Sequence, residues 1–177
     1  PLAAVTQRPM AMYHSWDSQN AWLRQIHTHN YLYVNTRTAL QQGIADGDWI
    51  WVESQWGKVR CMARHSEAVE PGTVWTWNAI GKAAGAWNLT PDANESQKGF
   101  LLNHLISEEL PGAGGRVSNS DPITGQAAWY DVRVRISKAE AGEPEQTSPQ
   151  FAVMKPYPGM KARSSILAFL GVKSKHD

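Results

Sequence analysis

Residues 31–77 decide the fold, and they read YLYVNTRTALQQGIADGDWIWVESQWGKVRCMARHSEAVEPGTVWTW. Residues 31–34 have the character of an apolar strand, and residues 36–42 have the pattern of a short helix. Gly43 follows where a left-handed C-terminal cap would fall. After the turn signal at residues 46–48, residues 49–54 are mostly β-branched or aromatic, which predicts a core strand covered on both faces.

A second turn, at residues 55–57, returns the chain as another strand. Along residues 58–63 the pattern alternates, so Val59 and Cys61 should point to one side and the polar residues to a wetter side. Residues 73–77 again have a period of two. Short strands at close spacing with one small helix predict a mainly β chain with flanking helices, folded as a compact, partly closed β-barrel.

The composition limits the class of protein. With 177 residues, the chain suits one domain, or one domain with a tail. Its 17 Lys plus Arg against 16 Asp plus Glu are scattered, which argues against a nucleic-acid surface, and no apolar run approaches the roughly 18 residues of a membrane span. Cys61 is the single cysteine, and we expect a buried thiol. The chain starts at Pro1, so we expect a processed product or a piece of a longer polypeptide.

The first polar segment covers residues 13–20 and reads YHSWDSQN. Asp17 or Ser18 is expected to cap a helix over residues 20–27, and the same stretch can also face a ligand. The apolar side of that helix should consist of Trp22, Leu23 and Ile26.

Residues 78–94 are rich in Gly, Asn and small residues, which is typical of a packed irregular loop that carries binding groups. Residues 95–110 have the spacing of an amphipathic helix. Asn103 interrupts its apolar patch, and we expect this amide either to join a local network or to face a ligand.

A second polar segment, residues 118–126, is either an exposed loop of Asx turns or another binding segment. Residues 129–136 alternate as a strand that closes the barrel. Residues 138–150 read as a linker or a wrapped strap, and residues 164–171 as a short helix that must dock on this domain or on a partner.

The sequence offers no metal-ligand cluster and no phosphate-binding loop. His27 and His29 have no Cys nearby and no Glu at helical spacing, which favours ordinary loop residues. Residues 81–85 lack the Gly-Lys-Ser/Thr of a phosphate loop.

Three pieces of the chain together resemble the C-terminal dinucleotide-binding domain of the DMSO-reductase superfamily of molybdenum and tungsten oxidoreductases. They are Thr6-x-Arg8 with His14-Ser15 and Gln19-Asn20, the stretch VNTRTALQQGIADGDWIWVESQWGKV, and Asn103 followed by SNSDPITGQ before the final strand. In this order they cover roughly residues 5–137. The start of the match looks most like the polysulfide/thiosulfate reductase and sulfite dehydrogenase branch.

The resemblance implies a double-psi β-barrel of the aspartate-decarboxylase-like kind over residues 1–137, with residues 138–177 as a polar linker and C-terminal docking tail. It also implies molybdopterin guanine dinucleotide, with molybdenum or tungsten, as a cofactor shared with further domains. A pterin edge is a row of donors and acceptors that amides and carboxylates match, and a pyrophosphate suits hydroxyls and N–H groups at a helix start. The cofactor contacts would be Thr6, Arg8, His14, Ser15, Trp16, Asp17, Ser18, Gln19, Asn78, Asn103, Asn119, Asp121 and Gln126.

On this resemblance the chain acts in an oxidoreductase of inorganic sulfur compounds but is not a catalyst alone. Its partners would be the remaining domains of the same enzyme or a larger catalytic subunit, together with an iron–sulfur electron-transfer subunit. The compartment would be the cytoplasm, or the periplasm if the parent chain carries a twin-arginine signal. We expect Ser15, Asn103 and Asp121 to converge at one rim of the barrel.

Two other functions remain open from the residues. One is a stand-alone small-molecule or carbohydrate-binding β-barrel module whose Trp residues stack on sugar rings. Amide-rich loops without acidic pairs beside the Trp residues argue against it. The other is a small barrel enzyme of the aspartate-decarboxylase type, which the absence of a Gly-Ser self-processing site disfavours.

Overall fold

The computed structural model describes most of the chain between its two ends. The described residues are 1–13, 16, 20–78, 80, 90, 92–107, 109–112, 115–127, 132–143, 145 and 150–151. The predicted helix over residues 164–171 and most of the predicted loop over residues 78–94 lie outside them.

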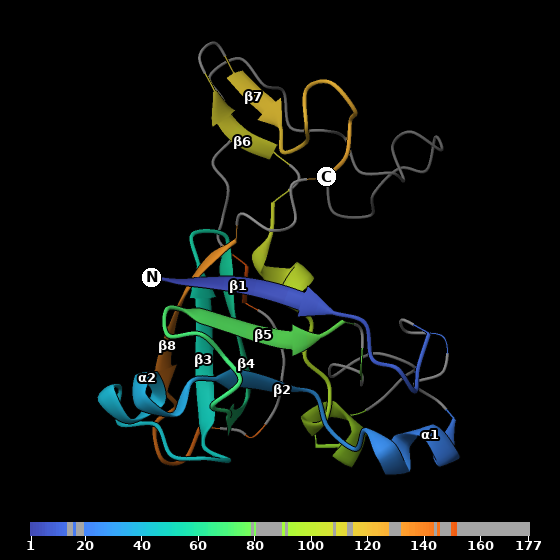
Figure 1. The fold of residues 1–177 in the computed structure, drawn as a ribbon, viewed down its shortest axis with the longest axis vertical. Helices are drawn as coiled ribbons and strands as arrows, with labels where there is room; N and C mark the ends of the chain where they lie inside the picture. Colours follow the sequence, from blue (N-terminus) through green and yellow to red (C-terminus); the bar gives the residue numbers. More distant parts are fainter. Residues whose placement is uncertain are drawn as a thin grey trace, which may run out of the picture.

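A closed barrel of six strands forms the body of the described part of the chain (Figure 1). Around the barrel the order is β2 (Tyr31–Val34), β5 (Thr73–Trp77), β1 (Leu2–Gln7), β8 (Arg133–Lys138), β3 (Trp49–Ser54) and β4 (Gly57–His65). β2 pairs with both β5 and β4, which closes the sheet on itself. The β1–β5 and β2–β4 pairs are parallel, and the other pairs of the barrel are antiparallel. The predicted mainly β barrel with short flanking helices is confirmed.

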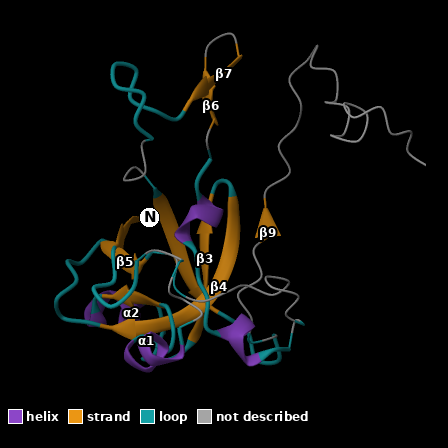
Figure 2. Ribbon diagram, turned by 90° about the vertical axis from the view of Figure 1, so that its right-hand side faces the viewer, coloured by secondary structure: helices purple, strands orange, loops and turns teal. Residues whose placement is uncertain are grey.

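Smaller elements attach to the barrel. They are α1 (Ala21–Ile26), α2 (Thr36–Gln41), the 3₁₀ helices η2 (Asn94–Gln97) and η3 (Leu102–Leu105), and β9 (Gln150–Phe151), which extends the sheet at β4. β6 (Glu109–Gly112) and β7 (Gly115–Ser118) pair only with each other among the described strands. In both overall views this hairpin stands beyond one end of the barrel (Figures 1 and 2).

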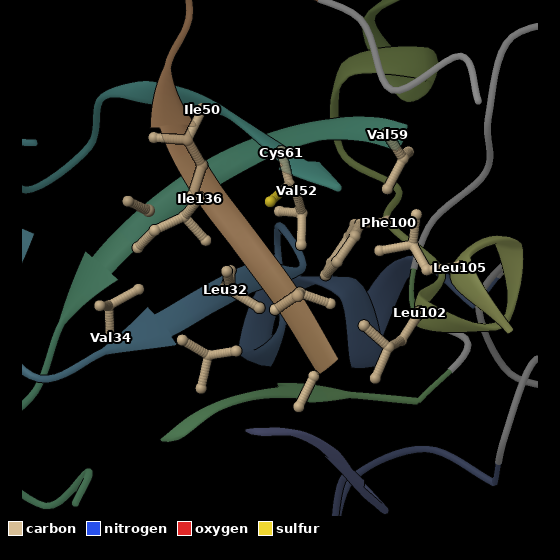
Figure 3. Close-up of a cluster of buried hydrophobic side chains, with 14 of the residues drawn as sticks. Leu32, Val34, Ile50, Val52, Val59, Cys61, Phe100, Leu102, Leu105 and Ile136 are labelled. Atoms are coloured by element: carbon tan, nitrogen blue, oxygen red, sulfur yellow. The ribbon is translucent and has the colours of Figure 1, made fainter. Parts of the chain in front are cut away.

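Alternate residues of the strands fill the barrel, as the period of two predicts (Figure 3). Leu32, Ile50 and Val59 are fully buried. Cys61 is also fully buried, which confirms the predicted buried thiol, and burial raises the pKa of this thiol. Arg60 departs from the expected wetter side, since it is only 6% exposed and its guanidinium carbon lies 4.4 Å from the centroid of the Trp51 ring.

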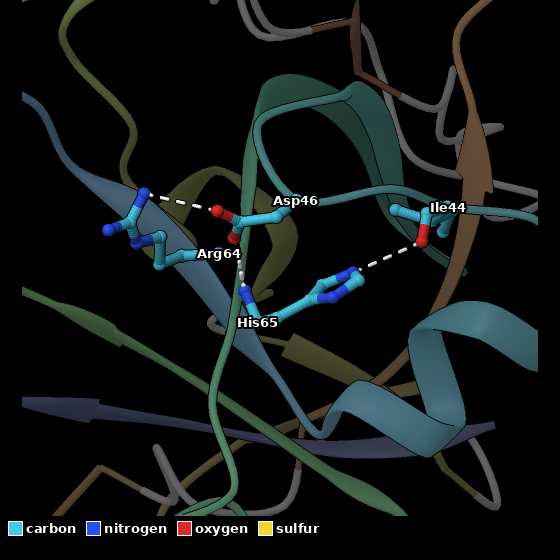
Figure 4. A network of polar contacts seen from close by, with 4 residues as sticks. All are labelled: Ile44, Asp46, Arg64 and His65. Carbon is cyan, nitrogen blue, oxygen red and sulfur yellow. Dashed lines mark hydrogen bonds and ion pairs between the residues drawn. The ribbon is translucent and has the colours of Figure 1, made fainter.

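Asp46 and Asp48 stabilise the turn between α2 and β3 by accepting hydrogen bonds. Asp46 accepts a 2.7 Å hydrogen bond from the backbone N–H of His65 and pairs with Arg64 at 3.2 Å (Figure 4). Gly43 has φ +68°, which confirms the predicted left-handed cap of the preceding helix. This tight path lets Ile44 turn inward and become fully buried.

Asp48 joins this turn to the end of β8, and its replacement gives a pH-dependent prediction. Its carboxylate accepts 2.7 Å hydrogen bonds from Lys138 Nζ and from the backbone N–H of Ala45. The Lys138 bond, and then the Ala45 bond, hold the pKa of Asp48 below its usual value. Near neutral pH, Asp48→Asn should therefore lower the free energy of unfolding by about 1 kcal/mol.

Because the folded state lowers this pKa, the stabilisation is present above the ordinary pKa of aspartate and is lost as the pH falls through the folded-state pKa. The difference between Asp48→Asn and the parent sequence should shrink in acid when urea denaturation is followed by tryptophan fluorescence. Glu67→Gln, at an exposed position, is the control. A difference that stays constant with pH would contradict the ionic role of Asp48.

Two predictions about helices are wrong. The cap of α1 is Asn20, not Asp17 or Ser18, because Asn20 Oδ1 accepts from the N–H groups of Trp22 at 3.0 Å and Leu23 at 3.4 Å. On the predicted apolar side of α1, Leu23 is half-buried and Trp22 and Ile26 are exposed.

The second error concerns the helix expected over residues 95–110. In that stretch the structure has η2 and η3 separated by a turn and irregular residues, and later the start of β6. Leu101 has extended backbone angles and no side-chain cap bond, so η3 begins anew after it. The apolar residues of the expected helix still serve the core, since Phe100, Leu102 and Leu105 are buried.

Residues 138–143 run along the outside of β3 and β4. Glu143 accepts hydrogen bonds of 3.0 and 3.2 Å from Trp51 Nε1, and Lys58 Nζ lies 4.3 Å from the centroid of the same ring. A surface pocket of about 290 Å³ lies beside this strap, between Asp48, Arg60 and Lys138. None of the described helices is long and apolar enough to cross a bilayer.

Candidate cofactor-binding rim

The carboxyl ends of β1 and β5 lie side by side and form one rim of the barrel (Figure 1). The parallel register places Thr6 opposite Thr76 and Gln7 opposite Trp77. The pairing continues past the strands, because the N–H of Asn78 donates to the carbonyl of Gln7 at 2.8 Å. Two segments about 70 residues apart in the sequence therefore present their polar groups at the same place. We call Thr6, Gln7, Arg8, Trp77 and Asn78 the rim.

The buried side chain of Asn30 is hydrogen-bonded to the rim. This residue is 3% exposed, and its side-chain amide donates to the carbonyls of Trp77 at 2.8 Å and of Phe100 at 2.7 Å. Its side-chain oxygen accepts from Thr76 Oγ1 at 3.0 Å, and its backbone N–H donates to the carbonyl of Lys98. One buried amide thus fixes the end of β5 and the segment that leads to η3.

Sequence reasoning missed Asn30. The residue stands directly before the apolar strand β2, at a position where an asparagine usually marks an exposed turn. Its partners lie 46, 47 and 70 residues away, so no local pattern distinguishes it from a loop residue.

Aromatic side chains cover the outside of the sheet below the rim. The rings of Tyr33 and Trp75 stack with centroids 4.0 Å apart, and Trp77 meets Trp75 edge-on at 4.8 Å. His27, the C-cap of α1, lies 5.5 Å from Trp77, and burial lowers the pKa of this imidazole. These contacts tie α1 to the end of β5.

The segment after β1 is anchored at two points and open between them. Pro9 and Met12 are buried, whereas the predicted contact Arg8 is exposed. Trp16, another predicted contact, is 72% exposed, and its backbone N–H donates to the carbonyl of Tyr13 at 3.1 Å. The other predicted contacts of this segment lie outside the described residues: His14, Ser15, Asp17, Ser18 and Gln19. At the start of α1, Asn20 already occupies the two N–H groups that it caps, so these do not face a phosphate.

Asn103 lies on η3 and is exposed. Leu102 and Leu105, on the same turn, are buried and hold η3 against the barrel. The side chain of Asn103 therefore points away from the core, which fits the ligand-facing alternative of the two that its sequence position left open.

The second polar segment forms a compact Asx turn. Asp121 Oδ1 accepts from the N–H groups of Ile123 at 3.0 Å and Thr124 at 2.6 Å, and from Thr124 Oγ1 at 2.9 Å. The Thr124 backbone bond is the main reason that the pKa of Asp121 is lowered. The carbonyl of Gln126 accepts from the N–H of Asp121, and Asn119 Nδ2 donates to the carbonyl of Ser107 at 2.9 Å. The predicted loop of Asx turns is confirmed.

Only part of the predicted set comes together among the described residues. Thr6, Arg8 and Asn78 meet at the rim. The loop that carries Asn119, Asp121 and Gln126 follows the β6–β7 hairpin and lies beyond the end of the barrel in both views (Figures 1 and 2). The expected convergence of Ser15, Asn103 and Asp121 stays a prediction, since Ser15 is outside the described residues.

The groups at the rim suit a dinucleotide. A hydroxyl from Thr6, a guanidinium from Arg8 and the amide of Asn78, whose side-chain oxygen is buried, are the donors and acceptors that a pyrophosphate and a polar heterocycle require. Within the described residues no three His, Cys, Asp or Glu side chains gather as metal ligands. Such a set of donors and acceptors at the ends of two parallel strands suits an anionic ligand.

Comparison with known proteins identifies the protein family of this chain. The model of the "Molydopterin dinucleotide binding domain" matches residues 2–118, and the chain belongs to this family. The cofactor is accordingly molybdopterin guanine dinucleotide, which carries molybdenum or tungsten. The predicted membership of the molybdopterin oxidoreductase superfamily is confirmed.

Individual relatives within this family differ in how similar they are to the chain. The chain is 72% identical over 165 residues to one subunit of the sulfite dehydrogenase of Allochromatium vinosum, a match that covers 92% of this chain and 17% of that relative. It is 30% identical over 145 residues to the dopamine dehydroxylase of Eggerthella lenta, which covers 78% of this chain and 12% of that protein. The chain therefore spans less than a fifth of the length of these relatives.

A solved structure supports the fold. Acetylene hydratase from Pelobacter acetylenicus superposes with a TM-score of 0.55 at 21% identity, over 78% of this chain and 18% of that one. The predicted barrel of this superfamily is thus confirmed.

Proposed function

We propose that this chain is the cofactor-binding domain of a larger molybdenum or tungsten oxidoreductase that acts on an inorganic sulfur compound, with sulfite as the first candidate. One observation carries the proposal: the 72% identity to the sulfite dehydrogenase relative extends over 92% of this chain. The relative named for dopamine is only 30% identical, which favours the sulfur branch.

In this proposal the chain binds and orients, and the cofactor supplies the oxygen-atom or electron transfer. Arg8 places a positive charge beside the pyrophosphate, and Thr6 and Asn78 donate and accept hydrogen bonds next to it. Asn30 keeps the end of β5 in register with β1 through its bond to Trp77, so the rim is preorganised before the ligand arrives. A dinucleotide is long, so residues beyond the barrel can contact its other end.

The chain alone is inactive in this proposal, because the domains that complete the site are supplied by the rest of the enzyme. Its partners are those domains or a larger catalytic subunit, together with an iron–sulfur electron-transfer subunit. The enzyme acts in the cytoplasm, or in the periplasm if the parent chain carries a twin-arginine signal.

The test uses the parent polypeptide. Acid iodine oxidation should release a fluorescent pterin, elemental analysis should find molybdenum or tungsten, and sulfite should reduce an artificial electron acceptor in the presence of the enzyme. A parent protein that holds neither pterin nor metal would overturn the cofactor. A loaded protein that is inert toward sulfite, thiosulfate and polysulfide would overturn the substrate class.

Removal of the cation at the rim should weaken cofactor retention. In the parent protein, Arg8→Ala should lower the affinity for the cofactor by about tenfold or more, since a hydrogen bond to a charged group contributes on the order of 1.5–3 kcal/mol. The readout is the pterin content per polypeptide after extensive dialysis, with thermal unfolding to check that the fold persists.

Arg37→Ala is the matched control, because Arg37 is an exposed arginine of α2, on the opposite side of the barrel from the rim (Figure 1). Equal pterin contents in the two variants would remove Arg8 from the binding site.

A further inference from the structure

Exposed apolar side chains concentrate in one short part of the chain. Among the described residues, the strongly exposed large apolar side chains are Met10, Tyr13, Trp16, Trp22, Ile26, Leu40 and Ile123. Five of these seven lie within residues 10–26. Single exposed apolar residues are ordinary, but exposed apolar residues that share one face of an element mark an interaction surface.

The helix α1 carries the most informative pair. Trp22 and Ile26 are four residues apart, so they share one face of the helix, and they are 79% and 64% exposed. None of the six residues of α1 is buried. Isolated helices this short are not stable in water, and amphipathic helices obtain most of their stability from packing. The contacts of its two caps, Asn20 and His27, leave the face of Trp22 and Ile26 uncovered.

The position of this face suggests its occupant. His27, the C-cap of α1, lies 5.5 Å from the ring of Trp77 in the rim, so a body that covers Trp22 and Ile26 also lies close to the rim. More than four-fifths of the length of the relatives lies outside the part that matches this chain. A covalently attached domain is present at high effective concentration and can use a face of this small size.

We infer that the apolar face formed by Trp22 and Ile26 on α1 is where another domain of the same parent polypeptide packs, beside the cofactor-binding rim. This inference rests on the proposed function, because it requires that the chain be one domain of a longer enzyme. Packing there excludes water from the rim, and polar contacts to the cofactor are stronger in a water-poor site.

Hydroxyl-radical footprinting of the purified parent protein tests the inference. Ile26 and Leu40 form a matched pair, since both are aliphatic and they are 64% and 63% exposed in this chain. In the parent, Ile26 and Trp22 should be labelled severalfold more slowly than their exposure in this chain predicts, and Leu40 at the rate of an exposed residue. Labelling of Ile26 at the rate of Leu40 would overturn the inference.

Two further footprinting measurements, one after dilution and one without the cofactor, distinguish other bodies that could cover this face. Protection of Ile26 that disappears on dilution to a monomer would show a second copy of the chain, and protection that disappears when the cofactor is absent from a folded polypeptide would show the cofactor. Either result overturns the inference. Protection that persists in both supports it.

A pair of variants gives a second readout. In the parent protein, Ile26→Asp should increase protease cleavage within residues 8–27 severalfold, because a buried carboxylate would loosen the contact. Leu40→Asp, at equal exposure, should leave cleavage unchanged. Equal cleavage of the two variants would overturn the inference.

These experiments distinguish failure of the proposed function from failure of the interdomain face. A parent that holds no pterin or is inert toward sulfur compounds, with Ile26 protected in it, would retain the interdomain face and lose the assigned chemistry. A loaded and active parent with Ile26 labelled like Leu40 would retain the chemistry and lose the face.

Discussion

Asn30→Ala should lower the free energy of unfolding by about 3 kcal/mol, because it removes three side-chain hydrogen bonds of a buried amide at once. The carbonyls of Trp77 and Phe100 would lose the amide donor, and the hydroxyl of the fully buried Thr76 would keep only its longer 3.4 Å contact to the carbonyl of Trp77. Alanine also leaves a small cavity between the end of β5 and the segment before η3. The rim should therefore loosen together with the fold.

Urea denaturation followed by tryptophan fluorescence measures this effect, and Asn20→Ala is the control. Asn20 is an exposed asparagine that caps α1, so its loss should cost about 1 kcal/mol. If Asn30→Ala destabilises the chain no more than Asn20→Ala, the three bonds of Asn30 are not a stabilising network. In the parent protein, Asn30→Ala should also lower the pterin content.

Phe100→Ala should lower the free energy of unfolding by about 3–5 kcal/mol. The ring is 1% exposed and belongs to the buried cluster with Val59, Leu102 and Leu105, where the close-up shows it projecting toward the barrel interior (Figure 3). It comes from the irregular segment between η2 and η3, so its packing fixes that segment to the barrel. Its loss should free η3, and with it the position of Asn103.

Phe100→Leu separates the packing from the mere presence of an apolar group, and it should cost about 1.5 kcal/mol or less. Equal losses for alanine and leucine, by the same denaturation measurement, would contradict a packed ring. The double variant with Asn30→Ala adds a coupling test, because Asn30 donates to the carbonyl of Phe100. Residues in direct contact share their effect, so the two losses should not add.

The strands were predictable because their signal is local. Alternation along residues 58–63 and 73–77 reports which side of the sheet is buried, and Gly43 reports a backbone angle that favours glycine. The strand over residues 49–54 was predicted from its β-branched and aromatic residues, but the expected cover on both faces is wrong, since only Ile50 and Val52 are buried. The same local logic failed at residues 95–110. Apolar residues at positions 100, 101, 102, 105 and 106 fit a helical period, but an irregular segment followed by a 3₁₀ turn also buries Phe100, Leu102 and Leu105.

The site could be predicted from the sequence less completely than the fold. Thr6 and Arg8 were proposed from a family resemblance, and the parallel pairing that brings them beside Asn78 joins strands about 70 residues apart, which no local pattern encodes. The periodicity of α1 was read correctly as apolar at Trp22 and Ile26. Periodicity does not show what covers such a face, and in this chain Trp22 and Ile26 are exposed.

The place of β1 in the barrel has a consequence for synthesis on the ribosome. β1 comes first in this sequence but lies between β5 and β8, so its second neighbour is complete only when Lys138 has been added. Until then the nascent barrel stays open along one side, with the groups of β1 and β3 that will pair with β8 still exposed. Closure is a late, long-range event, and a ribosome that stalls before β8 would release a chain prone to aggregate.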